Sequence, residues 1–502
     1  MKDIGKLASL LLALVMLFAL GAPALAEETY SITISSDATG HIYEAYQIFK
    51  GVLADGVLSD IEWGDSVANA DKLEDGAAVA DRLDENYAGT DKLGLGDLLA
   101  MIQLGAPVAN SGATVDPYVI SGLAAGYYLV KDQDGSLTGS DDAYTEYIIK
   151  VVGNVTAAPK SDATSVEKKV RDLNDSDGEG LTDWQDSADY DIGDSVPFRL
   201  KATLASNVSA YDGYKLVFHD TLSAGLTYNG DAKVCIDGKQ TDGFTASASA
   251  AADGSALLTF SCDDVKALGA VNSSVITVEY TATLNESAAI GAAGNPNDVW
   301  LEYSNNPYLS TETGRTPEDT VIVFTYKTVI SKVAKNPAYD PEGVLEDEVI
   351  EPYIPLTGAE FSLEKYDAAA DAWVEIEATV NEEGTEFTFT GLDDGDYRLT
   401  EIKTPKGYNS IAPIVFTVTA EHDVLSDSPA LTSLSGEADG GGLTFTADLS
   451  AGGLFADVLN KAGATLPETG GVGTTIFYAA GSALVVLALA AMIARRRMNR
   501  AK

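Results

Sequence analysis

The feature that most constrains the fold is the alternation of apolar and polar residues in short runs between turn-forming residues. In the stretch YRLTEIKTPKG, Tyr397, Leu399 and Glu401 share one parity. Side chains alternate between the two faces of a β-strand, so we predict a strand here whose apolar face is buried. Similar runs recur along the chain, and its 47 glycines suit frequent turns. The pattern predicts an extended all-β protein.

Composition limits the possible partners. The 502 residues leave room for three or four domains, and 76 acidic against 32 basic residues give a formal charge of −44. A field of this sign repels nucleic acid and anionic lipid, so neither is an expected partner. Cys235 and Cys262 are too few for a disulfide scaffold and suit either one cross-strand pair or two reduced thiols. Three histidines without a Cys/His cluster argue against a zinc site, and no cofactor is expected.

Both ends of the chain carry predicted targeting segments. Two lysines, the apolar run LASLLLALVMLFALGA and then Ala24-Leu25-Ala26 predict a secretory signal peptide over residues 1–26. Near the other end, the run from Ile476 to Ala494 is long enough to cross a bilayer as a helix, and arginines follow it on the predicted cytoplasmic side. The motif LPETG precedes that run and consists of Leu466, Pro467, Glu468, Thr469 and Gly470.

A buried acid in the last third of the chain has two candidate partners. Alternation places Glu401 on the buried face of its strand, and it places Lys332 of TVISKVAK beside the inward Ile330. The same argument turns Asn460 of FADVLNKAG inward. Because the first and last strands of a β-sandwich commonly lie side by side, we expect Lys332 and Asn460 to be in contact.

These three residue types can react with one another. Burial raises the pKa of a carboxylic acid and lowers that of a lysine, so a buried pair can coexist as COOH and NH₂. The neutral amine is a nucleophile, and the acid can polarise the amide. Attack of Lys332 on Asn460, with Glu401 as the acid and with loss of ammonia, predicts an intramolecular isopeptide bond. The alternative is a buried Lys–Glu ion pair, which is marginally stabilising at best.

The middle of the chain repeats this pattern. Alternation turns Lys168 of TSVEKKV and Asp220 of KLVFHD inward. In WLEYSNN it aligns Asn305 with the apolar face, which predicts a Lys168–Asn305 bond with Asp220 as the catalytic acid. Asn306 is a rival for Asn305, because a bulge at a strand end shifts the pattern by one residue.

Two weaker signals remain open. Lys50 and Asn154 are possible members of a third site, but each also fits an ordinary strand end. The stretch DSDGEGLTDWQD has a spacing of acids that is roughly that of an EF-hand loop, although no helices flank it and an acidic turn is the alternative. Its candidate Ca²⁺ ligands are Asp175, Asp177, Glu179 and Asp186.

Several motifs resemble those of the sortase-assembled major (backbone) pilins of Gram-positive bacteria. GHIYEAYQIFKG and GYYLVKD are similar to the N-terminal pilin domain, VEKKVRDLND and SADYDIGDSVPFRL to the fimbrial isopeptide-forming domain, and GDYRLTEIKTPKGY to a Cna B-type domain. LPETG with its apolar run and basic tail resembles a sortase sorting signal. The resemblance implies tandem immunoglobulin-like (Cna-type) β-sandwiches in an elongated array. The implied segments are 1–26 (signal peptide), 27–159 (pilin domain), 160–324 (isopeptide-forming domain), 325–463 (Cna B-type domain) and 464–502 (sorting signal).

The resemblance also implies a function. Sortase would cut between Thr469 and Gly470 and join Thr469 to an exposed lysine of a neighbouring subunit. Lys160 follows Pro159 and is similar to the pilin-motif lysine, although Ala158 stands where relatives commonly have Tyr, and an ordinary linker lysine is the alternative. The expected product is a non-enzymatic shaft subunit, exported and anchored to peptidoglycan. The alternative is a monomeric wall-anchored adhesin that presents a face to a host ligand.

Overall fold

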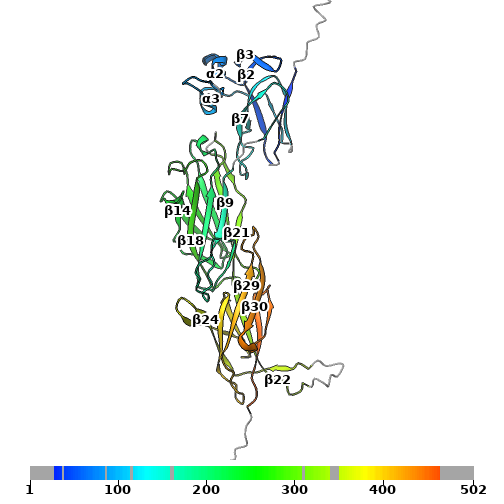
Figure 1. Cartoon of the computed structure of the whole chain (residues 1–502), viewed down its shortest axis with the longest axis vertical. Coiled ribbons are helices and arrows are strands. Elements are labelled where there is room, and N and C mark those ends of the chain that lie inside the picture. The colour runs from blue at the N-terminus through cyan, green and yellow to red at the C-terminus, as the bar shows by residue number, and fades with distance from the viewer. Residues whose placement is uncertain are drawn as a thin grey trace, which may run out of the picture.

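The described part of the chain forms three β-rich units stacked end to end (Figure 1). The computed structural model describes residues 28–36, 39–84, 87–113, 117–158, 163–307, 311–339 and 350–463. We call the units first, second and third in chain order. The prediction of an all-β chain is confirmed, since only two short α-helices accompany the strands in these ranges. No helix within them is long and apolar enough to cross a membrane, and the predicted membrane run lies outside them.

The first unit has two sheets with a small helical layer. The sheet orders are β5-β1-β8 and β3-β2-β6-β7, with β4 paired to β2. Its elements are β1 (Tyr30–Ile34), β2 (Tyr43–Ala54), β3 (Val57–Trp63), η1 (Ala70–Lys72), α2 (Gly76–Arg82), α3 (Leu95–Met101), β4 (Ala109–Asn110), β5 (Tyr118–Leu123), β6 (Gly126–Asp132), β7 (Glu146–Val151) and β8 (Val155–Ala157).

The second unit is a sandwich of two sheets. The order β10-β21-β19-β12-β17-β16 forms one sheet, with β20 on β19, and β15-β14-β18-β11-β9 forms the other, with β13 on β18. Its elements are β9 (Ser165–Val170), β10 (Ser187–Asp189), β11 (Ser195–Thr203), η2 (Val208–Ala210), β12 (Leu216–Leu222), β13 (Leu226–Tyr228), β14 (Lys233–Ile236), β15 (Lys239–Gln240), β16 (Thr245–Ala250), β17 (Ala256–Cys262), β18 (Val275–Leu284), β19 (Asn295–Ser304), β20 (Thr313–Arg315) and β21 (Asp319–Phe324).

The core of the second unit lies between these sheets. Strict alternation of buried and less buried residues along β11 and β18 turns one apolar face inward, as the period of two requires. Phe198 and Phe218 come from opposite sheets and belong to one continuous core. Cys235 of β14 and Cys262 of β17 also lie in opposite sheets, and both are free thiols, so the cross-strand disulfide is excluded.

The third unit is a second sandwich and continues directly from the second. The orders are β26-β27-β22-β32-β31, with β23 on β22, and β25-β24-β28-β29-β30. Its elements are β22 (Tyr326–Lys335), β23 (Tyr353–Pro355), β24 (Glu360–Asp367), β25 (Ala372–Ile376), β26 (Thr379–Val380), β27 (Glu386–Leu392), β28 (Gly395–Lys403), β29 (Ile414–His422), β30 (Leu431–Ala438), η3 (Asp439–Gly441), β31 (Phe445–Asp448) and β32 (Gly453–Leu459).

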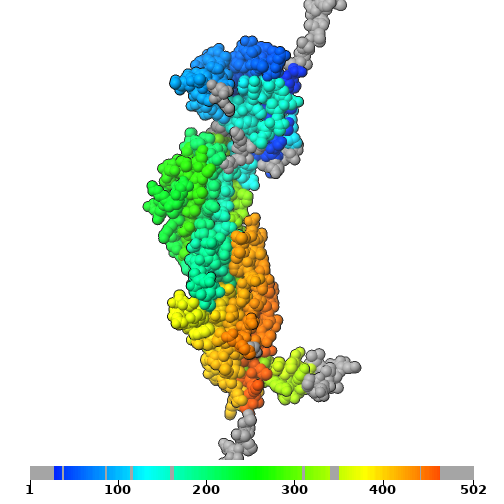
Figure 2. All heavy atoms as spheres, in the orientation of Figure 1, coloured from blue at the N-terminus to red at the C-terminus, as the bar shows by residue number. Residues whose placement is uncertain are grey.

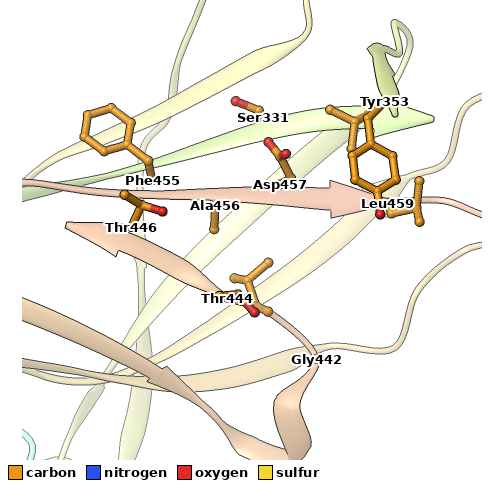
Figure 3. Close-up of a pocket in the computed structure, with 11 residues that line it drawn as sticks. Ser331, Tyr353, Gly442, Thr444, Thr446, Phe455, Ala456, Asp457 and Leu459 are labelled. Atoms are coloured by element: carbon orange, nitrogen blue, oxygen red, sulfur yellow. The ribbon is translucent and has the colours of Figure 1, made fainter. Parts of the chain in front are cut away.

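Two features of the third unit position its candidate site. The buried Thr325 alone separates β21 from β22, so the two sandwiches share a nearly continuous strand. The first and last strands, β22 and β32, are neighbours that run in the same direction (Figure 3). Phe455 and Asp457 point to one side of β32 and Ala456 points to the other, and all three border an outer pocket.

Candidate functional site

The third unit brings the predicted lysine, acid and amide together inside its core. Lys332 comes from β22 and Asn460 follows the end of β32, whereas Glu401 comes from β28 in the facing sheet. Lys332 lies opposite Val458 in the parallel register, so Asn460 projects inward two residues further on. All three side chains are buried. Alternation within each strand is therefore enough to aim all three at one point.

The contacts at this point form a closed triangle. The Lys332 Nζ donates to Asn460 Oδ1 (2.5 Å), and Asn460 Nδ2 donates to Glu401 Oε1 (2.7 Å). Lys332 Nζ also lies 3.4 Å from Glu401 Oε1. The second carboxylate oxygen, Oε2, accepts from the Ile411 amide (3.2 Å) and the Thr404 hydroxyl (3.3 Å). The carboxyl group is thereby held in one orientation beside the amide.

The surroundings favour an uncharged lysine. Burial lowers the pKa of Lys332, and the nearby Glu401 charge opposes this effect. The Phe361 ring lies 5.7 Å from Nζ and helps to keep water away. An amine that is neutral and already in contact with a carboxamide is placed for nucleophilic attack on the amide carbon.

A second buried site lies in the second unit and involves four residues. Lys168 Nζ donates to Asp220 Oδ1, and the Tyr280 hydroxyl donates to Asp220 Oδ2. The same hydroxyl accepts from Asn297 Nδ2 (2.8 Å) and lies 3.4 Å from Lys168 Nζ. Tyr280 thus connects the lysine, the acid and the amide. Asn297 Oδ1 is buried without a hydrogen-bond partner among the described residues.

Burial shifts the lysine and the acid of this site toward their neutral forms. It lowers the pKa of Lys168 and raises the pKa of Asp220, and in each case the charge of the other residue acts against the effect of burial. The proton is therefore shared more evenly between them than between the same groups in water. The amine and the carboxyl share the Tyr280 hydroxyl with the buried Asn297 amide, so the three predicted types of reactant lie in one hydrogen-bond network.

The prediction that Asn305 is the reacting amide of the second unit is wrong. Its Nδ2 donates to the main-chain oxygens of Leu137 (2.9 Å) and Asp142 (3.4 Å), which belong to the first unit. Asp220 lies opposite Val299 in the antiparallel register, six residues before Asn305. At about 3.3 Å per residue this separation is roughly 20 Å, too far for a lysine that contacts Asp220.

Asn297 takes the place that was predicted for Asn305, and one signal could have found it. Asn297 has the same parity as Asn305, so alternation alone does not separate them. Its rival, Asn306, donates to Glu312 (3.1 Å) and is equally remote. The distinguishing signal is register: Asn297 lies opposite Leu222, diagonal to Asp220 on the neighbouring strand. Tyr280 was missed because a Tyr on an apolar face resembles an ordinary core residue.

The residues of the two weaker candidate sites do not come together in the structure. Lys50 forms an exposed ion pair with Asp65 (2.8 Å), and Asn154 accepts from Ser31, so the first unit does not bring Lys50 and Asn154 together. The EF-hand-like stretch does not form one ring of ligands. Asp186 pairs with Lys169 on β9, whereas Asp175 faces Lys365 in the third unit. Lys160 and the LPETG residues 466–470 lie outside the described ranges.

Comparisons with known proteins match three regions of the chain separately and most of its length as a whole. Three family models match: the Gram-positive pilin backbone subunit 2, Cna-B-like domain over residues 192–307, the prealbumin-like fold domain over 352–428, and the LPXTG cell wall anchor motif over 459–500. The trypsin-resistant surface T6 protein of Streptococcus pyogenes serotype M6 is 25% identical over 460 residues, which cover 78% of this chain and 77% of the relative. The solved three-domain T6 backbone pilin of S. pyogenes matches with a TM-score of 0.51 at 16% identity, over 87% of this chain and 99% of that one.

Proposed function

We propose that the chain, which is similar to the Gram-positive backbone pilins, is the structural shaft subunit of a covalently polymerised, sortase-assembled pilus on a Gram-positive cell wall. The observation that carries the proposal is the pair of buried lysine–acid–amide sites in consecutive sandwiches. Buried ion pairs are poor stabilisers by themselves, whereas the same groups are the reactants of a cross-link.

Each site performs one self-modification. The lysine Nζ attacks the amide carbon, the carbon–nitrogen bond to the amide nitrogen breaks, and that nitrogen leaves as ammonia with the proton that the lysine loses. Glu401 serves Lys332 and Asn460, and Asp220 serves Lys168 and Asn297, each acid passing a proton between the two nitrogens. Tyr280 is a positioning residue that holds Asp220 beside Asn297. No turnover follows, so the chain is a substrate of its own chemistry and not an enzyme.

Polymerisation uses a lysine at the junction of the first two units and the LPETG motif near the C-terminal end of the chain. Sortase cuts LPETG between Thr469 and Gly470, and the Thr469 acyl group passes to Lys160 of the next subunit. The Thr469 acyl group of the last subunit is transferred to peptidoglycan instead, and this bond holds the fibre on the cell wall. The anchor-motif match and the position of Lys160 between the first and second units support this scheme.

Removing the acceptor amine tests the proposal. We expect Lys160→Ala to abolish the high-molecular-weight ladder that wall extracts of the native host strain show on denaturing gels, since no other residue is assigned the acceptor role. The control is Lys239→Ala, which changes an exposed lysine of the second unit and should leave the ladder intact. A single monomer band from the unmodified chain would instead favour a monomeric adhesin.

A further inference from the structure

The first unit contacts the second through the loop 133–145, which joins β6 to β7 and which we call the junction loop. It lies where the cyan part of the first unit meets the green second unit in Figure 2. Main-chain hydrogen bonds connect this loop to β20 and to the residue that follows β19. They are Gly139 N to Thr313 O (2.9 Å), Tyr144 N to Asn305 O (3.0 Å) and Arg315 N to Ser140 O (2.8 Å).

Side chains of the second unit add to this contact. Asn305 is fully buried, and its Nδ2 donates to the main-chain oxygens of Leu137 (2.9 Å) and Asp142 (3.4 Å). The Tyr303 hydroxyl donates to the main-chain oxygen of Asp141 (3.2 Å). The two units are thereby joined twice, once by the chain between β8 and β9 and once by the junction loop. Two separate connections fix the orientation of one unit on the other, whereas the chain alone would leave a hinge.

A buried histidine holds the junction loop on the side of the first unit. His41, just before β2, places Nδ1 2.8 Å from Asp132 Oδ1 and Nε2 3.1 Å from Asp142 Oδ2. Asp132 ends β6, and Asp142 belongs to the junction loop. Asp132 Oδ2 also accepts from the Thr145 amide (2.8 Å). We call His41, Asp132 and Asp142 the latch, because they fasten the end of the loop to the body of the first unit.

The contacts of the latch require a charged histidine. A neutral imidazole has one N–H, whereas both ring nitrogens of His41 face carboxylate oxygens, so both must donate. The Tyr43 ring stacks on the imidazole with the ring centroids 5.0 Å apart, an arrangement that favours a cation. Burial lowers the pKa of His41, but its hydrogen bonds to Asp132 and Asp142 outweigh this effect and raise the pKa to about 9. The imidazolium is therefore the form present at neutral pH.

Three phenols from neighbouring strands also face the latch. Tyr43 comes from β2, Tyr118 from β5 and Tyr147 from β7. Burial raises the pKa of all three, so each stays neutral while His41 titrates. Burial also raises the pKa of Asp132, and the contacts with His41 oppose that effect. Loss of the histidine proton would therefore leave two neighbouring carboxylates without a countercharge.

We propose that the latch is a pH-sensitive switch, in which charged His41 holds the junction loop against the second unit and loss of its proton releases the loop, so that the two units can move. Without that proton, one ring nitrogen would present its lone pair to a carboxylate oxygen. Asp142 leaves first, because 15% of its side chain is exposed whereas Asp132 is fully buried. Its main-chain oxygen then separates from Asn305.

The sign of the pH dependence follows from the raised pKa of His41. The stability that the latch supplies is complete below about pH 6.5, the ordinary pKa of histidine, and is lost as the pH rises through about 9. The switch lies within one chain, so it does not depend on the proposed polymerisation.

Hydrogen exchange of the purified chain at about pH 7 and about pH 10 tests the proposal. Each exchange rate is divided into the rate expected for an unstructured peptide at the same pH, which gives a protection factor. We expect the protection of the junction loop to fall at least about tenfold between these two pH values, while the strands of both units keep theirs. In His41→Gln the loop should already be poorly protected at neutral pH, and its protection should no longer depend on pH.

Two further variants separate a switch from a merely structural contact. Asp142→Asn keeps the size of the side chain and removes one of the two charges that stabilise the imidazolium, so the loop should lose protection at a lower pH than in the unmodified chain. The matched control is His422→Gln, which changes a histidine of β29 that contacts a buried carboxylate, that of Asp189, and should keep the pH dependence of the junction loop.

The proposal is overturned if the junction loop of the unmodified chain keeps its protection at the higher pH, or if His41→Gln shows the same pH dependence as the unmodified chain. It is equally overturned if the strands of the first unit lose protection together with the loop, since that would be alkaline unfolding of the whole unit. If His41→Gln does not fold, Asp142→Asn decides, because an unchanged pH of release in that variant contradicts the role of the latch.

Discussion

Glu401→Ala is expected to leave Lys332 and Asn460 unjoined, so that the variant keeps one ammonia, about 17 Da, that the unmodified chain loses. Without the acid, nothing at this site polarises the Asn460 amide or passes a proton to the leaving nitrogen. The cross-link would close a loop between residues 128 apart in sequence, and its loss should cost about 5 kcal/mol by the chain-entropy model. Intact-mass spectrometry measures the first effect and denaturant unfolding the second.

The control for this variant is an acid of the same sheet that lies outside the core. Glu360→Ala removes a half-exposed carboxylate that pairs with Lys403 on the surface, and it should lose ammonia as the unmodified chain does. Glu401→Gln keeps the shape of the side chain and should behave as Glu401→Ala. Complete loss of ammonia in either Glu401 variant would refute the role assigned to the acid.

Asn297→Ala is expected to remove the cross-link of the second unit, whereas Asn305→Ala is expected to keep it. Only Asn297 shares the buried hydrogen-bond network of Lys168 and Asp220, through the hydroxyl of Tyr280. The mass of each variant, compared with that calculated from its own sequence, should therefore show one missing ammonia for Asn297→Ala and two for Asn305→Ala. The loss in stability should again be about 5 kcal/mol, because the closed loop has a similar length.

The two asparagines act as controls for each other. Asn305→Ala removes contacts with the main chain of the first unit, so its effect should be confined to how the first two units pack. Peptide mapping locates the bond directly, since a Lys168–Asn297 link yields one branched peptide. A branched peptide that contains Asn305 would contradict our assignment of the second site.

The sequence predicted which three side chains meet in the third unit, because a period of two was sufficient there. Lys332 and Asn460 lie on the first and last strands, which are neighbours, and Glu401 faces them across the core. In the second unit the amide strand β19 is not the last one, because β20 and β21 follow it in the same sheet. Parity identified the correct face but could not choose between Asn297 and Asn305, since that choice depends on register with β12.

The contact between the second and third units was beyond sequence reasoning for a different reason. Asp189 and Asp393 are remote in sequence and meet only because Thr325 joins the two sandwiches so closely. The EF-hand-like acidic stretch places Asp175 and Asp186 beside different partners, Lys365 and Lys169. Spacing along the chain predicts a metal loop only when the loop supplies all the ligands itself.

The parallel pairing of β22 and β32 determines how the third unit responds to a stretching force. The chain enters at the start of β22 and leaves beyond the end of β32, so opposed pulls on the two ends slide the strands along each other. Sliding loads the whole ladder from Lys327 to Val333 at once, whereas antiparallel neighbours pulled from one end would unzip pair by pair. Before the proposed Lys332–Asn460 bond forms, the third unit therefore already resists extension in shear, and the proposed bond would take over a load that the hydrogen bonds share until then.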